Sequence, residues 1–164
     1  MRVYLPVTLT MLAEALAPGA ARELAPGSGF AVTPGMREWY ASGDTEELEY
    51  IALSLAAAAS LGLLSADPSA ARRRVVVAAD VDPAAVSVAD DGTRASRGRI
   101  SITRPIAFTR VAAVHVDDES AEGAVRAAAL EPSDEFAAEE AADHELLWYA
   151  TQEVDGLLRD LRSR

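Results

Sequence analysis

The chain has 164 residues, a formal net charge of −11 and no cysteine, and its sequence contains no lysine. Without cysteine there are no disulfides, thiolate nucleophiles or iron–sulfur clusters, and without lysine there is no Schiff-base chemistry or phosphate-binding lysine. The length suits one domain with a sizeable core, because a chain of this size buries about 70% of its unfolded surface on folding.

Acidic residues concentrate in the C-terminal third. Residues 1–110 contain 12 acidic residues and 11 Arg, whereas residues 111–164 contain 14 acidic residues and four Arg. This charge favours solubility and basic partners, and it opposes binding to nucleic acid or to anionic membranes. No apolar run approaches the roughly 18 to 20 residues that span a bilayer, and the N-terminus lacks the apolar core of a secretory signal. We therefore expect a cytoplasmic protein that does not contact a membrane.

The N-terminal half predicts two strand-to-helix units. In chain order we expect a strand over 2–6, a helix ending at Pro18, a strand over 30–33, a helix containing Trp39 and Tyr40, and a helix from Asp44 to Leu64. The last helix has the clearest pattern. Asp44 and Glu47 have the spacing of a capping box, and apolar residues follow at helical spacing.

The C-terminal half predicts three strands and then helices. A buried strand is expected over 74–79, a half-buried strand over 100–103 and an apolar strand over 111–116, with a long polar loop over 89–98. A helix is expected over 121–130. The acidic stretch 131–142 is either a loose helix or a mobile connector, and Asp143 is expected to begin the last helix, with Leu147, Val154 and Leu158 on its apolar face.

These elements predict a single α+β or α/β domain over residues 1–164. About five strands are expected, with helices placed before, between and after them. A mixed sheet with helices packed on one or both faces would bury the apolar side of every element.

Short segments spread along the chain carry a family resemblance: VYLP (3–6), FAVTP (30–34), REWY (37–40), ELEY (47–50), RVVVAADV (74–81), VAAVHVDD (111–118) and DHELLWY (143–149). With these segments the chain resembles a family of small uncharacterised actinobacterial proteins, a domain of unknown function, over nearly its full length. The resemblance implies a bacterial intracellular protein of one domain. It transfers no catalytic residue, because no activity is associated with the family.

His144 lies in the most concentrated polar cluster, between Asp143 and Glu145. Histidine transfers protons near neutral pH, and an adjacent carboxylate can fix its tautomer, so His144 and Glu145 are candidate catalytic residues. The second histidine of a zinc-protease helix is missing. A capping Asp, a first-turn Glu and a surface His account for the same residues without any site, and this interpretation is favoured.

His115 alternates with apolar neighbours on its predicted strand, and Asp117 points to the same side. If the last helix packs on that face, His115 and His144 meet. Together with Asp117 and Asp118 they would form a candidate metal or acid–base site, with His115 a further catalytic candidate. Hydrogen bonding, capping and solvation account for these four residues without any site, and this interpretation is favoured.

Two aromatic pairs, Trp39-Tyr40 and Trp148-Tyr149, are candidate interface residues, because Trp and Tyr combine a large apolar surface with a polar group. The run from Arg72 to Arg74 is interpreted as a solvated strand edge. No glycine-rich nucleotide fingerprint and no Gly-x-Ser-x-Gly elbow occur.

The first function hypothesis is accordingly a non-catalytic interaction or regulatory domain that binds a protein partner or a second copy of the chain. It requires no cofactor. The alternative is a metal-dependent or acid–base enzyme, hydrolase-like, in which a divalent metal is possible and the working residues are His115, Asp117, Asp118, His144 and Glu145.

Overall fold

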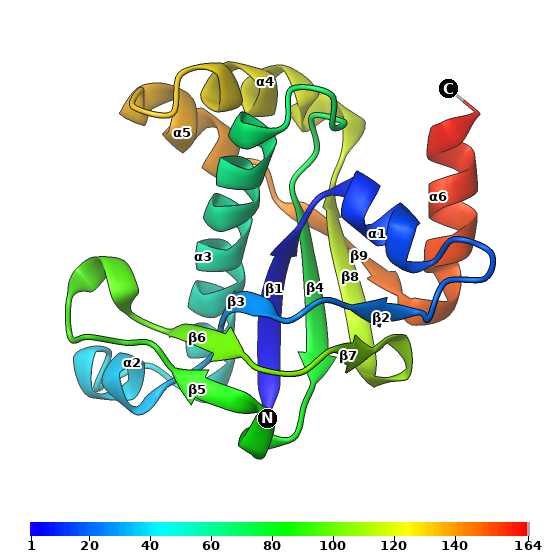
Figure 1. Ribbon diagram of the computed structural model, residues 1–164. Coiled ribbons are helices and arrows are strands. Elements are labelled where there is room, and N and C mark those ends of the chain that lie inside the picture. The colour runs from blue at the N-terminus through cyan, green and yellow to red at the C-terminus, as the bar shows by residue number, and fades with distance from the viewer. Residues whose placement is uncertain (164) are drawn as a thin grey trace.

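The computed structural model describes residues 1–163 and shows a curved seven-stranded sheet with helices on both faces (Figure 1). The strands are β1 (Arg2–Val7), β2 (Glu23–Leu24), β3 (Gly27–Phe30), β4 (Val75–Asp80), β5 (Val86–Val88), β6 (Arg99–Ile102), β7 (Ile106–Ala107), β8 (Val111–Asp117) and β9 (Leu146–Ala150). The helices are α1 (Leu9–Ala15), α2 (Pro34–Trp39), α3 (Thr45–Ala66), α4 (Glu122–Leu130), α5 (Glu135–Ala142) and α6 (Val154–Arg162).

The large sheet has the strand order β5-β6-β3-β1-β4-β8-β9, and β2 and β7 pair in a separate two-stranded sheet. Every pairing is antiparallel. The predicted α+β class is therefore confirmed, but the sheet is antiparallel throughout and has more strands than the five expected. The additional strands include β2, β5 and β7, which are only two or three residues long and too short to leave an alternating pattern.

The central strand β4 is apolar on both sides because both of its faces are covered. Val75 and Val77 belong to the core cluster on one face, and Val76 and Ala78 belong to the cluster on the other. β1 flanks β4 in full register, from Arg2 opposite Asp80 to Val7 opposite Val75. The continuous apolar run read from the sequence is thus a strand buried on two faces.

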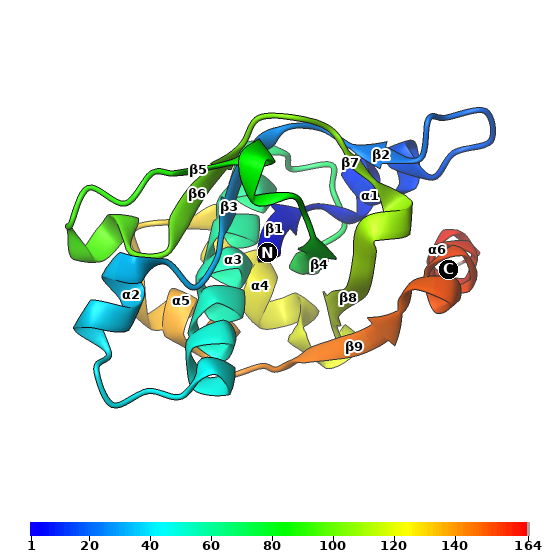
Figure 2. The same cartoon turned by 90° about the horizontal axis from the view of Figure 1, so that it is seen from below.

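One face of the sheet is closed by α1, α6 and the ribbon that contains β3 and β6. In Figure 1 this ribbon runs across the direction of β1 and β4, and in Figure 2 it lies on the side opposite α4 and α5. Its Ile100 and Ile102 join Leu12 of α1 and Leu158 of α6 in one buried cluster.

The other face is covered by α3. The predicted capping box is present, since Asp44 accepts from the Glu47 amide and Glu47 accepts from the Asp44 amide. The buried face of α3 includes Ala52 and Ala56, whose small side chains let the helix approach the sheet closely. The buried Ser60 hydroxyl accepts a hydrogen bond from the Val75 amide at 3.0 Å and donates one to the Val7 carbonyl at 2.8 Å, which ties α3 to β4 and β1.

By length and composition, α3 is also apolar enough to cross a membrane, because a window of 18 residues within it has a mean hydropathy of 1.6. The expectation that no segment approaches this length was therefore wrong. In the folded chain Leu48 and Leu64 of this helix are buried in contact with the sheet and with α4 and α5.

Most of the acidic stretch after α4 forms helix α5, Glu135–Ala142. Asp134 caps α5 by accepting from the amides of Phe136 and Ala137, and Ala137 and Ala141 are buried in a cluster shared with α4. Of the stretch 131–142, residues 135–142 are helical and residues 131–134 form the turn that precedes them.

The predicted last helix was wrong at its beginning. Residues 146–150 form strand β9, and α6 begins only at Val154. The spacing of Leu147 relative to the leucines of α6 favours a helix. The backbone of this aromatic segment instead forms hydrogen bonds with the free edge of β8, and this pairing makes it a strand.

Candidate functional site

A cavity of about 340 Å³ lies between α3, the β8–β9 edge of the sheet and the turn that precedes β9. The side chains that carry its chemistry are Tyr50 and Ser54 from α3, His115 from β8, His144 and Glu145 from the turn, and Trp148 from β9. The two histidines of the chain thus line one cavity. The strand β9 and its preceding turn bring them there, in place of the expected helix.

His115 is half-buried on the face of the sheet that α3 covers. It lies opposite Val76 of β4 and opposite Trp148 of β9. Burial lowers the pKa of His115 below its usual value of 6.5, and the positive charge of Arg2 lowers it further. The imidazole is therefore neutral at pH 7 and offers a nitrogen that accepts hydrogen bonds.

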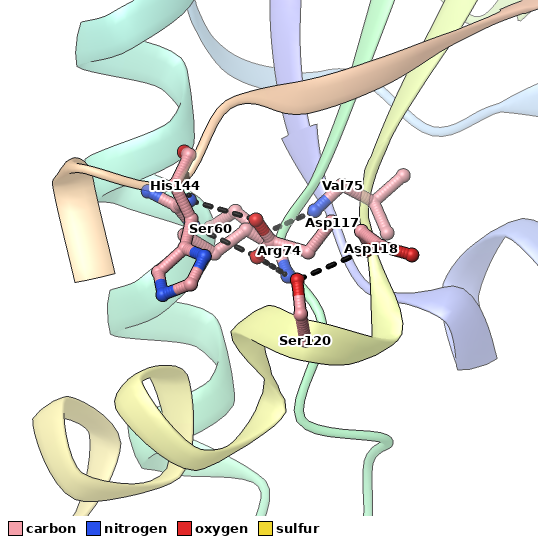
Figure 3. Close-up of polar contacts among 7 residues, drawn as sticks. All are labelled: Ser60, Arg74, Val75, Asp117, Asp118, Ser120 and His144. Carbon is pink, nitrogen blue, oxygen red and sulfur yellow. Dashed lines mark hydrogen bonds and ion pairs between the residues drawn. The ribbon is translucent and has the colours of Figure 1, made fainter.

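Asp117 is committed to an ion pair with Arg74. Its carboxylate accepts from the Arg74 Nε at 2.8 Å, from Nη2 at 2.7 Å and from the Arg74 backbone amide at 2.8 Å. The same Nη2 donates to the His144 carbonyl at 2.9 Å, so this pair also fixes the turn before β9 (Figure 3). Both side chains are buried, and Asp117 therefore has a structural partner in place of a metal.

Asp118 lies outside the histidine cavity. Its carboxylate accepts from the Ser120 hydroxyl at 2.9 Å, and this hydrogen bond lowers the pKa of Asp118 (Figure 3). Within residues 1–163, no three His, Asp or Glu side chains gather where they could hold a metal ion. The predicted set of His115, Asp117, Asp118 and His144 is thus not assembled into a metal site.

The catalytic candidates share the cavity without a nucleophile in position. The serine in the lining is Ser54, and its hydroxyl donates to the Tyr50 carbonyl at 2.9 Å instead of to a histidine. A serine that acts as a nucleophile through a general base needs its hydroxyl within hydrogen-bond reach of that base. What the cavity offers is a neutral imidazole, the carboxylate of Glu145 and two aromatic side chains.

The four predicted interface aromatics differ in their surroundings. Trp148 is 61% exposed, whereas Tyr149 packs against the apolar cluster on the opposite face of the sheet. Trp39 is also exposed, but the guanidinium of the buried Arg97 stacks over its ring at 3.4 Å and holds the 89–98 loop against α2. Tyr40 lines a second cavity beside the N-terminal part of α3.

β9 is an edge strand of the large sheet. Its inner edge pairs with β8, and among residues 1–163 no strand pairs with its outer edge. Leu147 and Trp148 are its exposed side chains, and the five residues of β9 include neither a charge nor a proline.

A family of unknown function, DUF6912, matches residues 1–158 of the chain. The chain belongs to this family. The resemblance to a domain of unknown function, drawn from the seven sequence segments, is thereby confirmed. No curated protein and no solved structure matches the chain.

Tyr50, Ser54 and Arg74, which line the cavity in this DUF6912 member, escaped the sequence analysis as site residues. Tyr50 lines both the histidine cavity and the one that contains Tyr40, and it lies off the apolar stripe of its helix, which is the signal that could have indicated it. Arg74 was interpreted as part of a solvated edge and is instead buried. Its partner Asp117 is 43 positions away, and no local pattern predicts that contact.

Proposed function

We propose that this chain is a non-catalytic protein-binding domain, which takes an extended, basic segment of a partner protein along the outer edge of β9. The observation that carries the proposal is the open edge of β9 beside the exposed Trp148. Unpaired backbone groups on an edge strand are a template for another strand, and peptide recognition by strand addition uses such edges.

The two edges of the sheet differ in their protection. β5, at the far edge, is only three residues long, and short edge strands resist pairing with other chains. β9 is five residues long and lacks the charges and prolines that commonly block an edge. Strand addition is therefore favoured at β9.

Charge favours a basic partner over a second copy of the chain. Acidic residues Asp143, Glu145 and Glu153 flank β9, in the part of the chain that contains 14 acidic residues and four Arg. Pairing of two β9 strands would bring the acidic residues that flank β9 in both copies to one edge, where like charges repel each other.

The proposal includes a cytoplasmic location in a bacterium, actinobacterial as the sequence resemblance implies. The absence of cysteine is compatible with a reducing compartment. A regulatory role would follow from the identity of the bound partner.

The test is a titration with two fluorescent ten-residue peptides, one repeating Arg-Val and the other repeating Glu-Val, followed by anisotropy. The proposal predicts that only the basic peptide binds and that Leu147→Lys weakens its binding by adding a positive charge to the β9 edge. Val88→Lys, on the exposed side chain of β5, is the matched control and leaves binding unchanged. Equal binding of both peptides, or no effect of Leu147→Lys, contradicts the proposal.

A second candidate is an acid–base or metal-dependent enzyme, hydrolase-like. It is supported by the neutral His115 lining the same cavity as His144 and Glu145. A thermal-shift series with Mg²⁺, Mn²⁺ and Zn²⁺ tests its metal-dependent form, since a ligand at 100 times its Kd stabilises a fold by about 2.7 kcal/mol. A metal-dependent rise that His144→Ala abolishes favours this candidate, and flat curves count against it.

A further inference from the structure

We propose that the cavity between Tyr50 and Trp148 receives one cationic side chain, arginine or lysine, from the segment bound on β9. The inference rests on the proposed function and adds to it the residue that the site selects. It assigns Tyr50 and Trp148 as aromatic walls and Glu145 as the counter-charge.

The first support is the pair of aromatic side chains. Tyr50 comes from α3 and Trp148 from β9, and both line the same cavity. Both side chains are accessible to a ligand, since Tyr50 is 60% exposed and Trp148 is 61% exposed. The face of an aromatic ring attracts a cation, and Trp attracts it most strongly. A cationic side chain that enters this cavity can therefore contact an aromatic ring from α3 and another from β9.

The second support is the charge of the lining. Arg74 is neutralised by its two side-chain hydrogen bonds to Asp117, and the half-buried His115 is neutral at pH 7. None of the four ion pairs found within residues 1–163 includes Glu145. The cavity therefore carries an unpaired negative charge at its rim.

The cavity that contains Tyr40 adjoins the histidine cavity and is also aromatic and acidic. It shares Tyr50 with the first and is lined by Tyr40, Glu46 and Glu47, so the surface along the first turns of α3 is aromatic and acidic as well. No arginine lines this second cavity, so a cation approaching along α3 meets acidic groups and aromatic rings.

The third support is strand geometry. Trp148 lies directly opposite His115 of β8, so its side chain is on the sheet face that α3 covers. A strand added to the outer edge of β9 places one residue opposite Trp148 on that same face, with Cβ atoms about 5 Å apart. A long cationic side chain at this position packs its stem on the Trp148 ring and reaches the cavity with its charged end.

The test compares two nine-residue peptides, Thr-Val-Thr-Val-Arg-Val-Thr-Val-Thr and the same sequence with citrulline, the neutral analogue of arginine, at the centre. Binding is measured by fluorescence anisotropy. We expect the arginine peptide to bind roughly 2- to 30-fold more tightly, the range that a cation–aromatic contact supplies. A lysine at the centre is expected to restore most of this preference.

Three variants locate the effect. Trp148→Leu is expected to reduce the preference for the arginine peptide, because it keeps an apolar edge residue and removes one of the two aromatic walls. Glu145→Gln is expected to reduce the preference for arginine. Glu135→Gln is the matched control: it removes one exposed acidic charge of the same region outside the cavity lining, and it retains the preference.

The outcomes separate this inference from the proposed function. Equal binding of the arginine and citrulline peptides to the unmodified chain, or a preference that neither Trp148→Leu nor Glu145→Gln reduces, overturns the cationic site and leaves strand addition standing. If no peptide binds in any form, strand addition itself fails, and the cationic site fails with it.

Discussion

Arg74 and Asp117 form a buried ion pair that joins the start of β4 to the end of β8. Their side chains are 4% and 0% exposed, and the closest atoms, Nη2 and Oδ1, are 2.7 Å apart. Because Arg74 also donates to the His144 carbonyl, the pair determines where the turn before β9 lies. The position of the candidate binding edge thus depends on a contact within the fold.

Removing one partner of this pair is expected to be strongly destabilising. Asp117→Ala leaves the Arg74 guanidinium buried without its counter-charge, and breaking a buried pair in this way costs about 3–5 kcal/mol. Urea unfolding followed by circular dichroism measures the loss. Asp118→Ala, which removes the exposed neighbouring carboxylate, is the control and is expected to have a far smaller effect. Similar losses for both variants would show that the pair does not stabilise the fold.

Ser60→Ala is expected to lower the free energy of unfolding by about 1–3 kcal/mol, the range for leaving buried polar groups unsatisfied. The Val75 amide and the Val7 carbonyl both lose their side-chain partner. The control is Ser65→Ala, whose hydroxyl bonds only to the Leu61 carbonyl of its own helix, and its change should stay within about 0.5 kcal/mol. Chemical denaturation of the two variants decides the question.

Stability is expected to fall as the pH falls below about 6.5, in part through His115. The unfolded chain has a His115 of ordinary pKa, whereas burial lowers that pKa in the folded chain. Between the two values the unfolded state binds more protons, so acidification favours unfolding in that window. The carboxyl groups with lowered pKa, such as Asp80 beside Arg2, act in a separate window below about 3.8.

His115→Gln is expected to reduce the dependence of the unfolding free energy on pH below about 6.5, because glutamine does not titrate. Urea midpoints at pH 8, 6 and 5 measure this slope for the variant and the unmodified chain. An unchanged slope would mean that His115 keeps its ordinary pKa in the fold.

Two glycines are expected to respond to alanine in opposite ways. Gly98 has a φ of +73°, a conformation that alanine rarely adopts, and a Cβ there would also clash with the Met36 Cε, so Gly98→Ala destabilises the loop packed on α2. A Cβ at Gly62, inside α3, meets nothing within 4 Å, so Gly62→Ala is expected to stabilise the chain by about 0.5–1 kcal/mol. Melting temperatures that move in the same direction for both would contradict this account.

The features that the sequence predicts best are those with a local cause. The helix from Asp44 follows from a capping box, and the strand over Val75–Val77 follows from a β-branched run. Both signals are complete within a few residues. The helix over 121–130 likewise appears where the strand-to-helix step placed it, as α4.

The features that the sequence missed depend on distant partners. Leu147 and Trp148 look helical beside the leucines of α6, and only the free edge of β8 turns them into a strand. Arg74 looks solvated until Asp117 meets it. The sequence analysis predicted that His115 and His144 would meet only if the last helix packed on the sheet. The two residues do line one cavity, but strand β9 and its preceding turn bring them together instead of a helix.

The most direct test of strand addition at β9 is backbone amide hydrogen exchange with and without the Arg-Val peptide. Strand addition predicts that the peptide slows exchange at residues 146–150 and leaves residues 86–88 of β5, the other edge of the sheet, unchanged. Slower exchange at β5, or no protection at β9 under conditions where the peptide binds, would contradict it.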